Sequence, residues 1–189
     1  MALRVIAGSQ KGRSLKAVPG RGTRPTTDKV KEAMFNIIGP YFTGGYGLDL
    51  FAGSGALGIE GLSRGLEHVI FCDVSRKALA TIKENIERCG FKERAEVYRA
   101  DWKKILHLIT ERKEKFSVIW LDPPYEQHVY IKVLEKIASS ELLAPDGVIV
   151  CEHAATLTLP DQIGMFERWK YAEYGTIAIS IFIENSKEE

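Results

Sequence analysis

The chain has 189 residues, 45% of them hydrophobic and 27% charged, which is typical of one globular domain with room for a short appendage. No apolar run is long enough to cross a bilayer and the N-terminus lacks the apolar core of a secretory signal, so we expect a cytoplasmic protein without a membrane span. The three cysteines have no C-x-x-C pair and the four histidines have no metal-ligand spacing, so we predict no bound metal. A monomer is the default expectation.

The basic residues are concentrated at the start of the chain. Residues 1–31 carry eight Lys or Arg side chains and one Asp, a net charge of +7 in a chain whose net charge is +1. Such a segment is typical of contact with an anionic partner, most often nucleic acid, although a solvated basic arm would have the same composition. The residues that we expect to bind RNA are Arg4, Lys11, Arg13, Lys16, Arg21 and Arg24.

The N-terminal segment is expected to form a hairpin, a loop and a helix. Two short apolar runs, residues 3–8 and 13–18, flank the sequence SQKG and suggest a small β-hairpin. A helix is predicted after the loop, because Thr27 or Asp28 can cap its N-terminus and apolar residues then recur at helical spacing.

From Tyr46 onward, short apolar strands alternate with amphipathic helices. This alternation indicates an α/β fold whose mostly parallel sheet is covered by helices on both faces. Two further strand-like runs around Tyr174 and Gly175 predict a C-terminal antiparallel hairpin. We therefore expect two parts, residues 1–40 and residues 41–189. The five parallel strands are expected at residues 46–51, 68–73, 95–101, 116–122 and 147–153.

A glycine-rich turn follows the first of these strands. Gly53, Gly55 and Gly58 fit the pattern G-x-G-x-x-G, and Asp73 follows at the end of the second strand, at the spacing that a dinucleotide-binding fingerprint has. In a nucleotide-binding site of this kind, glycines allow close approach of the backbone and the acid accepts from a ribose hydroxyl. Glycines that serve only a tight turn would give the same pattern.

Four aspartates are predicted at the carboxyl ends of successive strands, namely Asp49, Asp73, Asp101 and Asp122. Ligands of open α/β sheets bind at this edge. Four carboxylates disfavour a pyrophosphate and suit a ligand that has a cationic centre, a ribose and an adenine. S-adenosylmethionine carries an ammonium, a sulfonium and no phosphate, and we predict it as the cofactor.

Each part of this cofactor has an expected partner. We expect the backbone of residues 52–55 to pass under the methionine part and Asp49 to contact its ammonium, directly or through water. Asp73 is expected to accept from the ribose hydroxyls and Asp101 from the adenine amine, with Trp102 packed on the ring. Asp101 can also cap the helix that follows it. The predicted cofactor-binding residues are Asp49, Phe51, Ala52, Gly53, Ser54, Gly55, Asp73, Val74, Asp101 and Trp102.

The fourth strand ends in the sequence LDPPY, residues 121–125. An exocyclic amine is a poor nucleophile because its lone pair is delocalised into the base. Asp122 and the backbone carbonyl of Pro123, whose direction the prolines restrict, can accept the amine hydrogens and return the lone pair to nitrogen. Tyr125 offers a face on which a flipped base stacks. We predict Asp122, Pro123, Pro124 and Tyr125 as catalytic residues; a Pro-Pro turn beside a packed tyrosine is the alternative.

Four segments in this order resemble the bacterial RsmD-type methyltransferases over nearly the whole chain: RVIAGSQKGRSLKAVPG, TRPTTDKVKEAMFNII, DLFAGSGALGIEGLSRG and LDPPY. The first two point to this family, because many amine methyltransferases share the last two. The resemblance implies a Rossmann-like class I methyltransferase sheet. It also implies methyl transfer from S-adenosylmethionine to the N2 amine of a guanine in small-subunit (16S) ribosomal RNA, with that RNA or the small subunit as partner.

Individual positions also compare with the family. The resemblance places Arg24-Pro25-Thr26 in a loop near the mouth of the active site. The chain departs from the family at Asp73, where glutamate is frequent, and at Trp102, where a small residue is usual.

Three other functions are compatible with parts of the sequence. A DNA adenine methyltransferase needs a target-recognition region, for which 189 residues leave little room. NAD-dependent oxidoreduction fits the glycine turn but leaves LDPPY and the basic segment unexplained. An RNA-binding ribosome-assembly factor without catalysis has no need of Asp122 and Tyr125. The motif itself leaves adenine, cytosine and guanine amines open as targets.

Overall fold

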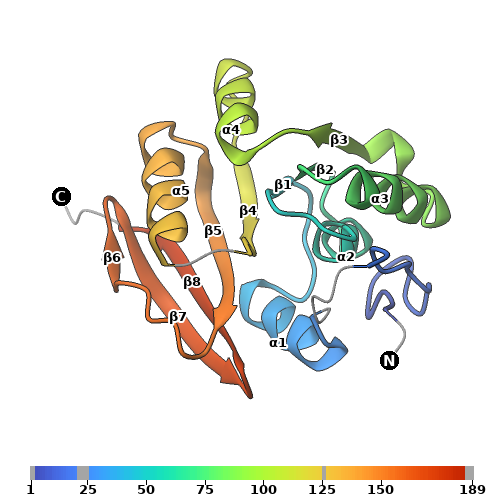
Figure 1. The fold of residues 1–189 in the computed structure, drawn as a ribbon, viewed down its shortest axis with the longest axis horizontal. Helices are drawn as coiled ribbons and strands as arrows, with labels where there is room; N and C mark the ends of the chain where they lie inside the picture. The colour runs from blue at the N-terminus through green and yellow to red at the C-terminus, as the bar shows by residue number, and fades with distance from the viewer. Residues whose placement is uncertain (1–2, 21–25, 125–126, 186–189) are drawn as a thin grey trace. The chain divides into compact units, whose positions relative to one another are not determined.

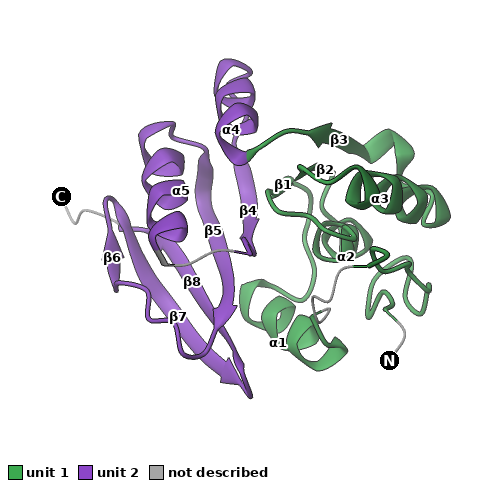
Figure 2. Ribbon diagram, in the orientation of Figure 1, with its two compact units in different colours: residues 1–101 green, residues 102–189 purple. Residues whose placement is uncertain are grey.

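The structure, a computed structural model, describes residues 3–20, 26–124 and 127–185. It contains two compact units, Met1–Asp101 and Trp102–Glu189, which are described in turn (Figure 2). These units are defined by their internal contacts. The domain boundary expected after residue 40 stays a prediction.

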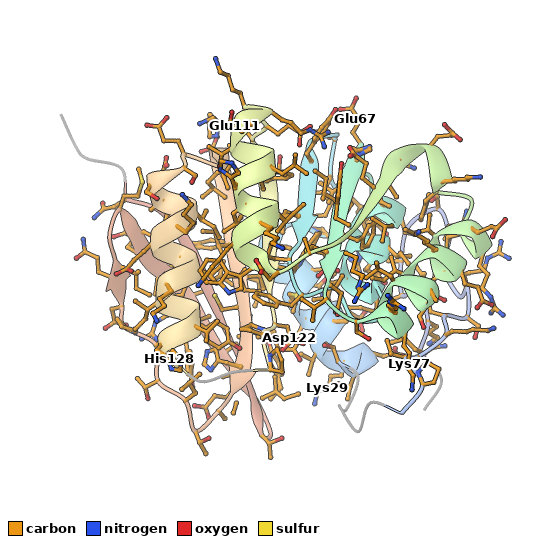
Figure 3. The ribbon with its side chains drawn as sticks, turned by 45° about the horizontal axis from the view of Figure 1, so that its top comes forward. Lys29, Glu67, Lys77, Glu111, Asp122 and His128 are labelled. Carbon is orange, nitrogen blue, oxygen red and sulfur yellow. The ribbon has the colours of Figure 1, made fainter. Side chains whose placement is uncertain are left out.

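Unit 1 alternates strands and helices. Its elements are α1 (Asp28–Ile38), β1 (Tyr46–Asp49), α2 (Ala56–Ser63), β2 (His68–Asp73), α3 (Arg76–Arg88), a 3₁₀ turn (Lys92–Arg94) and β3 (Ala95–Arg99). The strands lie in the order β3-β2-β1 and pair in parallel, with Leu48 opposite Ile70. Figure 3 shows Glu67, before β2, and Lys77, in the first turn of α3, at opposite ends of this unit's strands. The parallel pairing predicted for these strands is confirmed, and it places their carboxyl ends at one edge.

Local sequence explains where the helices begin. The Thr27 side chain accepts a hydrogen bond from the backbone N–H of Val30 at 3.3 Å, and the predicted cap of α1 is confirmed. Ser75 accepts from the N–H of Ala78 at 3.3 Å and caps α3 in the same way. Each cap satisfies a backbone donor that the helix itself leaves without a partner.

Helix α2 packs closely against β2. A β-carbon at Gly58 would lie 2.3 Å from the ring of Phe71, so only glycine permits this approach. The strand residues beneath the helix, Val69 and Phe71, are fully buried. Close packing here fixes the first turn of α2 against the sheet.

Unit 2 contains α4 (Trp102–Glu111), β4 (Phe116–Leu121), α5 (Gln127–Ser139), β5 (Leu143–Ala154), β6 (Gln162–Ile163), β7 (Phe166–Tyr174) and β8 (Ile177–Glu184). Its strands lie in the order β4-β5-β8-β7-β6 (Figure 1). Strands β4 and β5 are parallel, and the remaining pairs are antiparallel. The chain reverses between β7 and β8 at Gly175, whose φ is +65°, so the predicted C-terminal hairpin is confirmed.

The residues before α1 pair over a shorter length than expected. Arg4 and Ser14 form an isolated antiparallel bridge, and the N–H of Val5 donates to the carbonyl of Arg13 at 2.9 Å. Val5 and Leu15 are buried. The predicted hairpin is therefore a short pairing, and residues 3–20 form no full strand.

Membrane spans and metal clusters are both absent from the described residues. No helix in residues 3–20, 26–124 or 127–185 is both long and apolar enough to span a membrane. Over the same ranges, no cluster of three or more His, Cys, Asp or Glu side chains has an arrangement that could hold a metal ion. The cysteines Cys72, Cys89 and Cys151 are free thiols and are buried.

Candidate functional site

The glycine turn, residues 52–55, connects β1 to α2 in unit 1. Gly53 and Gly55 have φ values of +57° and +79°, in the left-handed region that favours glycine. The N–H of Ala52 donates to the carbonyl of Cys72 at 2.9 Å, which joins the turn to the end of β2. The turn therefore has a defined backbone conformation at the edge where β1 and β2 end.

Asp49 is the last residue of β1 and is almost fully buried. Its carboxylate accepts from the N–H of Gly58 at 3.2 Å. Burial raises the pKa of Asp49 from 3.8 to about 7, the hydrogen bond from Gly58 opposes this shift, and the charge of Asp73 adds to it. A cation beside this carboxylate would relieve the cost of ionising it, as the predicted contact with an ammonium requires.

Asp73 is the last residue of β2, and its carboxylate accepts from backbone N–H groups of the glycine turn and of the residues that follow β2. One carboxylate oxygen accepts from the N–H of Gly53 at 2.9 Å, and the other accepts from the N–H of Ser75 at 2.9 Å. An ionised carboxylate has about four acceptor positions, so one side chain can accept from backbone N–H groups and from ribose hydroxyls. Asp73 thus helps to hold the glycine turn, and its predicted contact with ribose stays a prediction.

A third acid lies at the same edge of unit 1. Asp101 is exposed and follows the end of β3 closely in the chain. Burial, together with the charges of Asp73, Asp101 and Asp49, raises the pKa of the Cys72 thiol to about 12, and the hydrogen bond to the carbonyl of Ala100 opposes this shift. Asp49 and Asp73 end two strands that pair in parallel, and the Cys72 thiol donates to the carbonyl of Ala100, the residue before Asp101, at 3.1 Å. The predicted clustering of these acids is therefore found within unit 1.

Exposed apolar side chains occur among the predicted cofactor contacts. Val74, next to Asp73, is 55% exposed, which is unusual for a valine. Phe51 is partly exposed, and so is Trp102, the first residue of α4 in unit 2. The Lys103 ammonium lies 5.5 Å from the centre of the Trp102 ring. Exposed apolar surface beside a carboxylate, as at Val74 and Asp73, suits a ligand that presents both a ring and hydroxyl groups.

The LDPPY motif follows β4 in unit 2. Figure 3 shows Asp122 at the end of this strand, and its side chain is exposed. Pro123 is buried and Pro124 is exposed. Tyr125 lies outside the described residues, and its predicted role stays a prediction.

A buried hydrogen bond lies next to the motif. The Tyr130 hydroxyl, on α5, donates to the backbone carbonyl of Glu152, on β5, at 2.5 Å. Burial raises the pKa of Tyr130, and the nearby charge of Asp122 is the next contribution. Leu121, the residue before Asp122, lies opposite Cys151 of β5, so Asp122 follows β4 near the point where α5 is joined to the end of β5.

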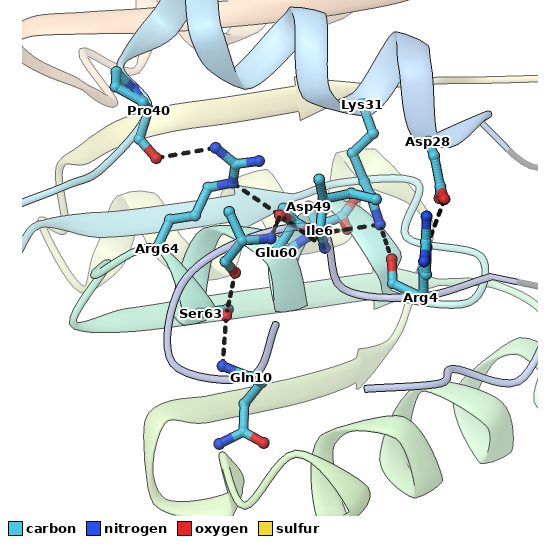
Figure 4. A network of polar contacts seen from close by, with 12 residues as sticks. Arg4, Ile6, Gln10, Asp28, Lys31, Pro40, Asp49, Glu60, Ser63 and Arg64 are labelled. Carbon is cyan, nitrogen blue, oxygen red and sulfur yellow. Dashed lines mark hydrogen bonds and ion pairs between the residues drawn. The ribbon is translucent and has the colours of Figure 1, made fainter. Parts of the chain in front are cut away.

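A buried carboxylate joins the N-terminal segment to the interior of unit 1 (Figure 4). Glu60, on α2, accepts from the backbone N–H of Ile6 at 2.9 Å and of Ala7 at 3.0 Å. It also pairs with the Lys31 ammonium at 3.2 Å and the Arg64 guanidinium at 2.8 Å. Burial lowers the pKa of Lys31, and the charge of Glu60 opposes that shift. The N-terminal segment is thus a packed part of unit 1.

Asn85, near the C-terminal end of α3, links the N-terminal segment to the glycine turn. Its side-chain oxygen accepts from the backbone N–H of Lys16 at 2.8 Å. Its NH₂ group donates to the carbonyls of Lys16 and Ser54, each at 2.9 Å. One buried amide therefore fixes the backbone at two places that are far apart in the sequence.

Two of the cations predicted to bind RNA form ion pairs within unit 1. The Arg4 guanidinium lies 2.7 Å from Asp28, and the Lys16 ammonium lies 2.5 Å from Glu84. Both cations are more than half exposed, so neither pair prevents contact with a phosphate. A carboxylate partner does reduce the net attraction of each for an anion.

The other four predicted RNA-binding residues divide into two groups. Lys11 and Arg13 are exposed in the turn of the N-terminal segment. Arg21 and Arg24 lie outside the described residues, as does Pro25 of the loop predicted near the active site. RNA contact by these side chains stays a prediction.

The chain matches the family described as Conserved hypothetical protein 95 over residues 3–183. It belongs to this family. YlbH of Bacillus subtilis (strain 168), named a "Putative rRNA methyltransferase", is 50% identical over 180 residues, which are 95% of this chain and 98% of YlbH. "Ribosomal RNA small subunit methyltransferase D" of Haemophilus influenzae is 34% identical over 152 residues, 79% of this chain and 78% of that protein.

Solved structures of other proteins have the same fold as this chain. A protein of Escherichia coli titled "Putative methyltransferase yhhF" has a TM-score of 0.83 at 25% identity, over 99% of this chain and 100% of that chain. SMU.776, titled a methyltransferase candidate complexed with SAH, has a TM-score of 0.66 at 13% identity, over 81% of this chain and 49% of that one. The second is a likeness of fold alone. The predicted Rossmann-like methyltransferase sheet, mostly parallel with antiparallel C-terminal strands, is confirmed.

Sequence reasoning missed Glu60, Lys31 and Asn85. A signal for two of them was present, because each is polar on the apolar face of a predicted helix. Lys31 lies three and four residues before the buried Met34 and Phe35, and Asn85 lies three residues after Ile82 and four before Cys89, both buried. A charged or amide side chain at such a position must have a buried partner. Only the tertiary structure of this chain identifies that partner.

Proposed function

We propose that the chain transfers a methyl group from S-adenosylmethionine to the exocyclic N2 amine of a guanine in small-subunit (16S) ribosomal RNA. The observation that carries the proposal is the cluster of three aspartates around the glycine turn of unit 1, in a member of this family. A methyltransferase fold and relatives named as rRNA methyltransferases support it. The N2 amine and the small-subunit target rest on the RsmD-type resemblance.

The side chains of unit 1 fit this cofactor. Asp49 is a buried carboxylate whose pKa of about 7 would fall when an ammonium binds beside it. In this proposal Asp73 accepts from the ribose hydroxyls, and the exposed Val74 offers an apolar surface to the adenine. Asp101 accepts from the adenine amine in this proposal. When bound, S-adenosylmethionine supplies an electrophilic methyl group on a cationic sulfur.

The motif of unit 2 acts on the target amine in this proposal. Asp122 and the carbonyl of Pro123 accept the two amine hydrogens, which favours a pyramidal nitrogen with a localised lone pair. Tyr125 stacks on the flipped base and holds it in place. Asp122 or water takes the proton that the methylated amine releases. Most of the rate acceleration would come from positioning and charge placement.

The partner in this proposal is ribosomal RNA, either free or within the small subunit. The basic N-terminal segment supplies phosphate contacts that do not read sequence. The enzyme is expected to work as a monomer in the cytoplasm.

Methyl transfer to defined nucleic acids tests the proposal. Labelled S-adenosylmethionine is incubated with the protein and, separately, with 16S RNA, small subunits and duplex DNA, all from cells that lack the enzyme. We expect label in RNA or subunits, none in DNA, and N2-methylguanine after nuclease digestion. Label recovered as N6-methyladenine would contradict the guanine assignment. Absence of label in every substrate, with cofactor bound, would contradict the enzymatic proposal itself.

A further inference from the structure

An open polar groove lies on unit 1, and none of the acids Asp49, Asp73 and Asp101 lines it. Residues 9–14 and Arg88 line it, and its volume is about 750 Å³. Three of its side chains are exposed cations: Lys11 and Arg13 from the N-terminal segment and Arg88 from the end of α3. Arg88 lies well beyond the basic segment in the sequence, so the charge count of that segment does not include it.

Two Arg side chains from different parts of the sequence, Arg13 and Arg88, line the same groove. Burial raises the pKa of the Cys89 thiol, and the charges of Arg13 and Arg88 both oppose that shift. Arg13 and Arg88 both line the groove, and Arg88 is the chain neighbour of Cys89. Like charges in proximity are unfavourable unless an anion lies between them, so this arrangement favours an anionic ligand.

Neighbouring polar groups orient these cations. The Gln10 side-chain oxygen accepts from Nε and Nη2 of Arg13 at 3.3 and 3.2 Å. Glu84 lies 3.4 Å from Nε of Arg88 and is shared with Lys16. Among the described residues, no ion pair with a carboxylate is found for Lys11 or Arg13. The groove therefore keeps a net positive charge even with Glu84 beside it.

The turn that carries Lys11 is fixed to α2. The N–H of Ser9 donates to the carbonyl of Ser63 at 2.8 Å, and the N–H of Gln10 donates to the Ser63 hydroxyl at 3.0 Å. A β-carbon at Gly8 would lie 1.8 Å from the carbonyl oxygen of Ser63, so the turn sits directly on the helix. Because the backbone is held in place, an anion that binds here orders only side chains.

We propose that this groove binds the phosphodiester backbone of the RNA substrate, with Lys11, Arg13 and Arg88 as its cations. The inference rests on the proposed function, because it takes RNA as the partner. The described residues that line the groove have hydroxyl, amide and cationic side chains and no aromatic ring, so the groove contacts phosphates and does not stack bases. Arg88 makes the site a joint surface of the N-terminal segment and α3.

Salt dependence gives the expected effect. Each phosphate contact with a single strand contributes about 0.7 to the slope of log affinity against log salt concentration. Replacing all three cations should therefore reduce the slope by about 2. Arg88→Gln alone should reduce it by about 0.7.

The experiment compares two triple variants of the full chain with the same change in charge. The groove variant is Lys11→Gln/Arg13→Gln/Arg88→Gln. The control variant, Lys83→Gln/Lys92→Gln/Lys132→Gln, removes three exposed cations that do not line the groove. The affinity for a short fluorescent single-stranded RNA of mixed sequence is measured by anisotropy at several salt concentrations. Circular dichroism confirms folding, and calorimetry measures binding of S-adenosylmethionine.

We expect a shallower slope for the groove variant, a wild-type slope for the control, and equal cofactor affinity in all three proteins. Equal slopes for the two variants would overturn the groove, and so would wild-type protein that binds no RNA. An unchanged slope for Arg88→Gln would overturn the joint surface. If the groove variant has the shallower salt slope but the wild-type protein methylates no RNA, the proposed function is wrong and the groove remains an RNA-binding site.

Discussion

At the scale of single residues, burial alters Asp49 most clearly. Its pKa is raised from 3.8 to about 7, chiefly because the ionised form is desolvated. The folded protein therefore holds this proton more tightly than the unfolded chain. The resulting stabilisation is complete below about pH 4 and is lost as the pH rises through about 7. An ionised Asp49 is therefore costly to the fold unless a cationic ligand pairs with it.

Asp49→Asn should remove the pH-dependent loss of stability while keeping an acceptor for the N–H of Gly58. The free energy of unfolding of the variant, relative to wild type, should increase by roughly 2–3 kcal/mol between pH 5 and pH 8. Urea unfolding at both pH values measures this difference. A difference that is the same at pH 5 and pH 8 would show that Asp49 does not titrate in this range.

The same proton should compete with the cofactor. The affinity of wild type for S-adenosylmethionine, divided by that of Asp49→Asn, should rise between pH 6 and pH 8 as Asp49 ionises. Calorimetry over this range measures the ratio, and using a ratio cancels titration of the cofactor itself. If this affinity ratio is near one at every pH, the ammonium group of S-adenosylmethionine does not bind beside Asp49.

Asp122→Ala should keep cofactor affinity and lose methyl transfer by roughly 100-fold or more, because its contact is with the target amine. Tyr125→Ala should lose activity through poor stacking, and Tyr125→Phe, which keeps the ring, should be much milder. Single-turnover transfer to 16S RNA, together with calorimetric cofactor binding, measures both effects. Near wild-type transfer by Asp122→Ala would rule out the proposed grip on the amine.

At the scale of elements, buried polar side chains join the N-terminal segment to α1, α2 and α3. Glu60 satisfies two backbone donors and two cations from different elements, as Figure 4 shows. Asn85 satisfies three backbone groups, namely the N–H and carbonyl of Lys16 in the N-terminal segment and the carbonyl of Ser54 in the glycine turn. Buried groups of this kind cost little while they are paired and much when one partner is removed.

Glu60→Gln should destabilise the protein by about 3–5 kcal/mol, because it leaves the Lys31 ammonium buried without its carboxylate. The double variant Glu60→Gln/Lys31→Met should recover part of this loss. Urea unfolding of the two single variants and the double variant gives the coupling energy of the pair. Strictly additive effects would show that the two side chains do not depend on each other.

Asn85→Leu should lower both stability and affinity for S-adenosylmethionine, because the carbonyl of Ser54 loses the donor that holds it. The stability loss should be about 1–3 kcal/mol. Thr81→Val is a matched control on the same helix, since its buried hydroxyl bonds to the carbonyl of Lys77 within α3. If the two variants bind the cofactor equally well, Asn85 has no part in shaping the glycine turn.

At the scale of the whole molecule, the predicted functions are divided between the two units. Most of the predicted cofactor contacts belong to unit 1, and Trp102 and the LDPPY motif belong to unit 2 (Figure 2). Ligand binding stabilises the whole folded chain by mass action, whichever unit holds the ligand.

S-adenosylmethionine at about 100 times its dissociation constant should stabilise the protein by about 2.7 kcal/mol. For a chain of this size the midpoint of thermal unfolding should then rise by roughly 5–10 °C. NAD at the same concentration should give no shift, because its pyrophosphate meets the carboxylates of Asp49, Asp73 and Asp101. Scanning calorimetry measures both, and a shift with NAD alone would support the oxidoreductase alternative.

Much of the fold was predictable because its signals are local. The alternation of apolar strands with helices from Tyr46 follows from side-chain periodicity, and the cap at Thr27 follows from one hydroxyl and its neighbours. The glycine turn and LDPPY were recognisable because each places special backbone conformations beside a carboxylate within a short stretch of chain. The N-terminal hairpin was overestimated, because its apolar residues are buried by packing within unit 1 and do not need to extend as strands.

By itself, the sequence determined the α/β class, the positions of the acids at strand ends and the basic character of the N-terminal segment, since each depends on neighbours in the chain. Only the tertiary structure decided that Glu60 and Asn85 bind the N-terminal backbone, that Lys31 is buried, and that Arg88 joins Lys11 and Arg13 at one groove. These contacts join residues that are far apart in the sequence. Their partners depend on how the elements pack, and no local pattern encodes that packing.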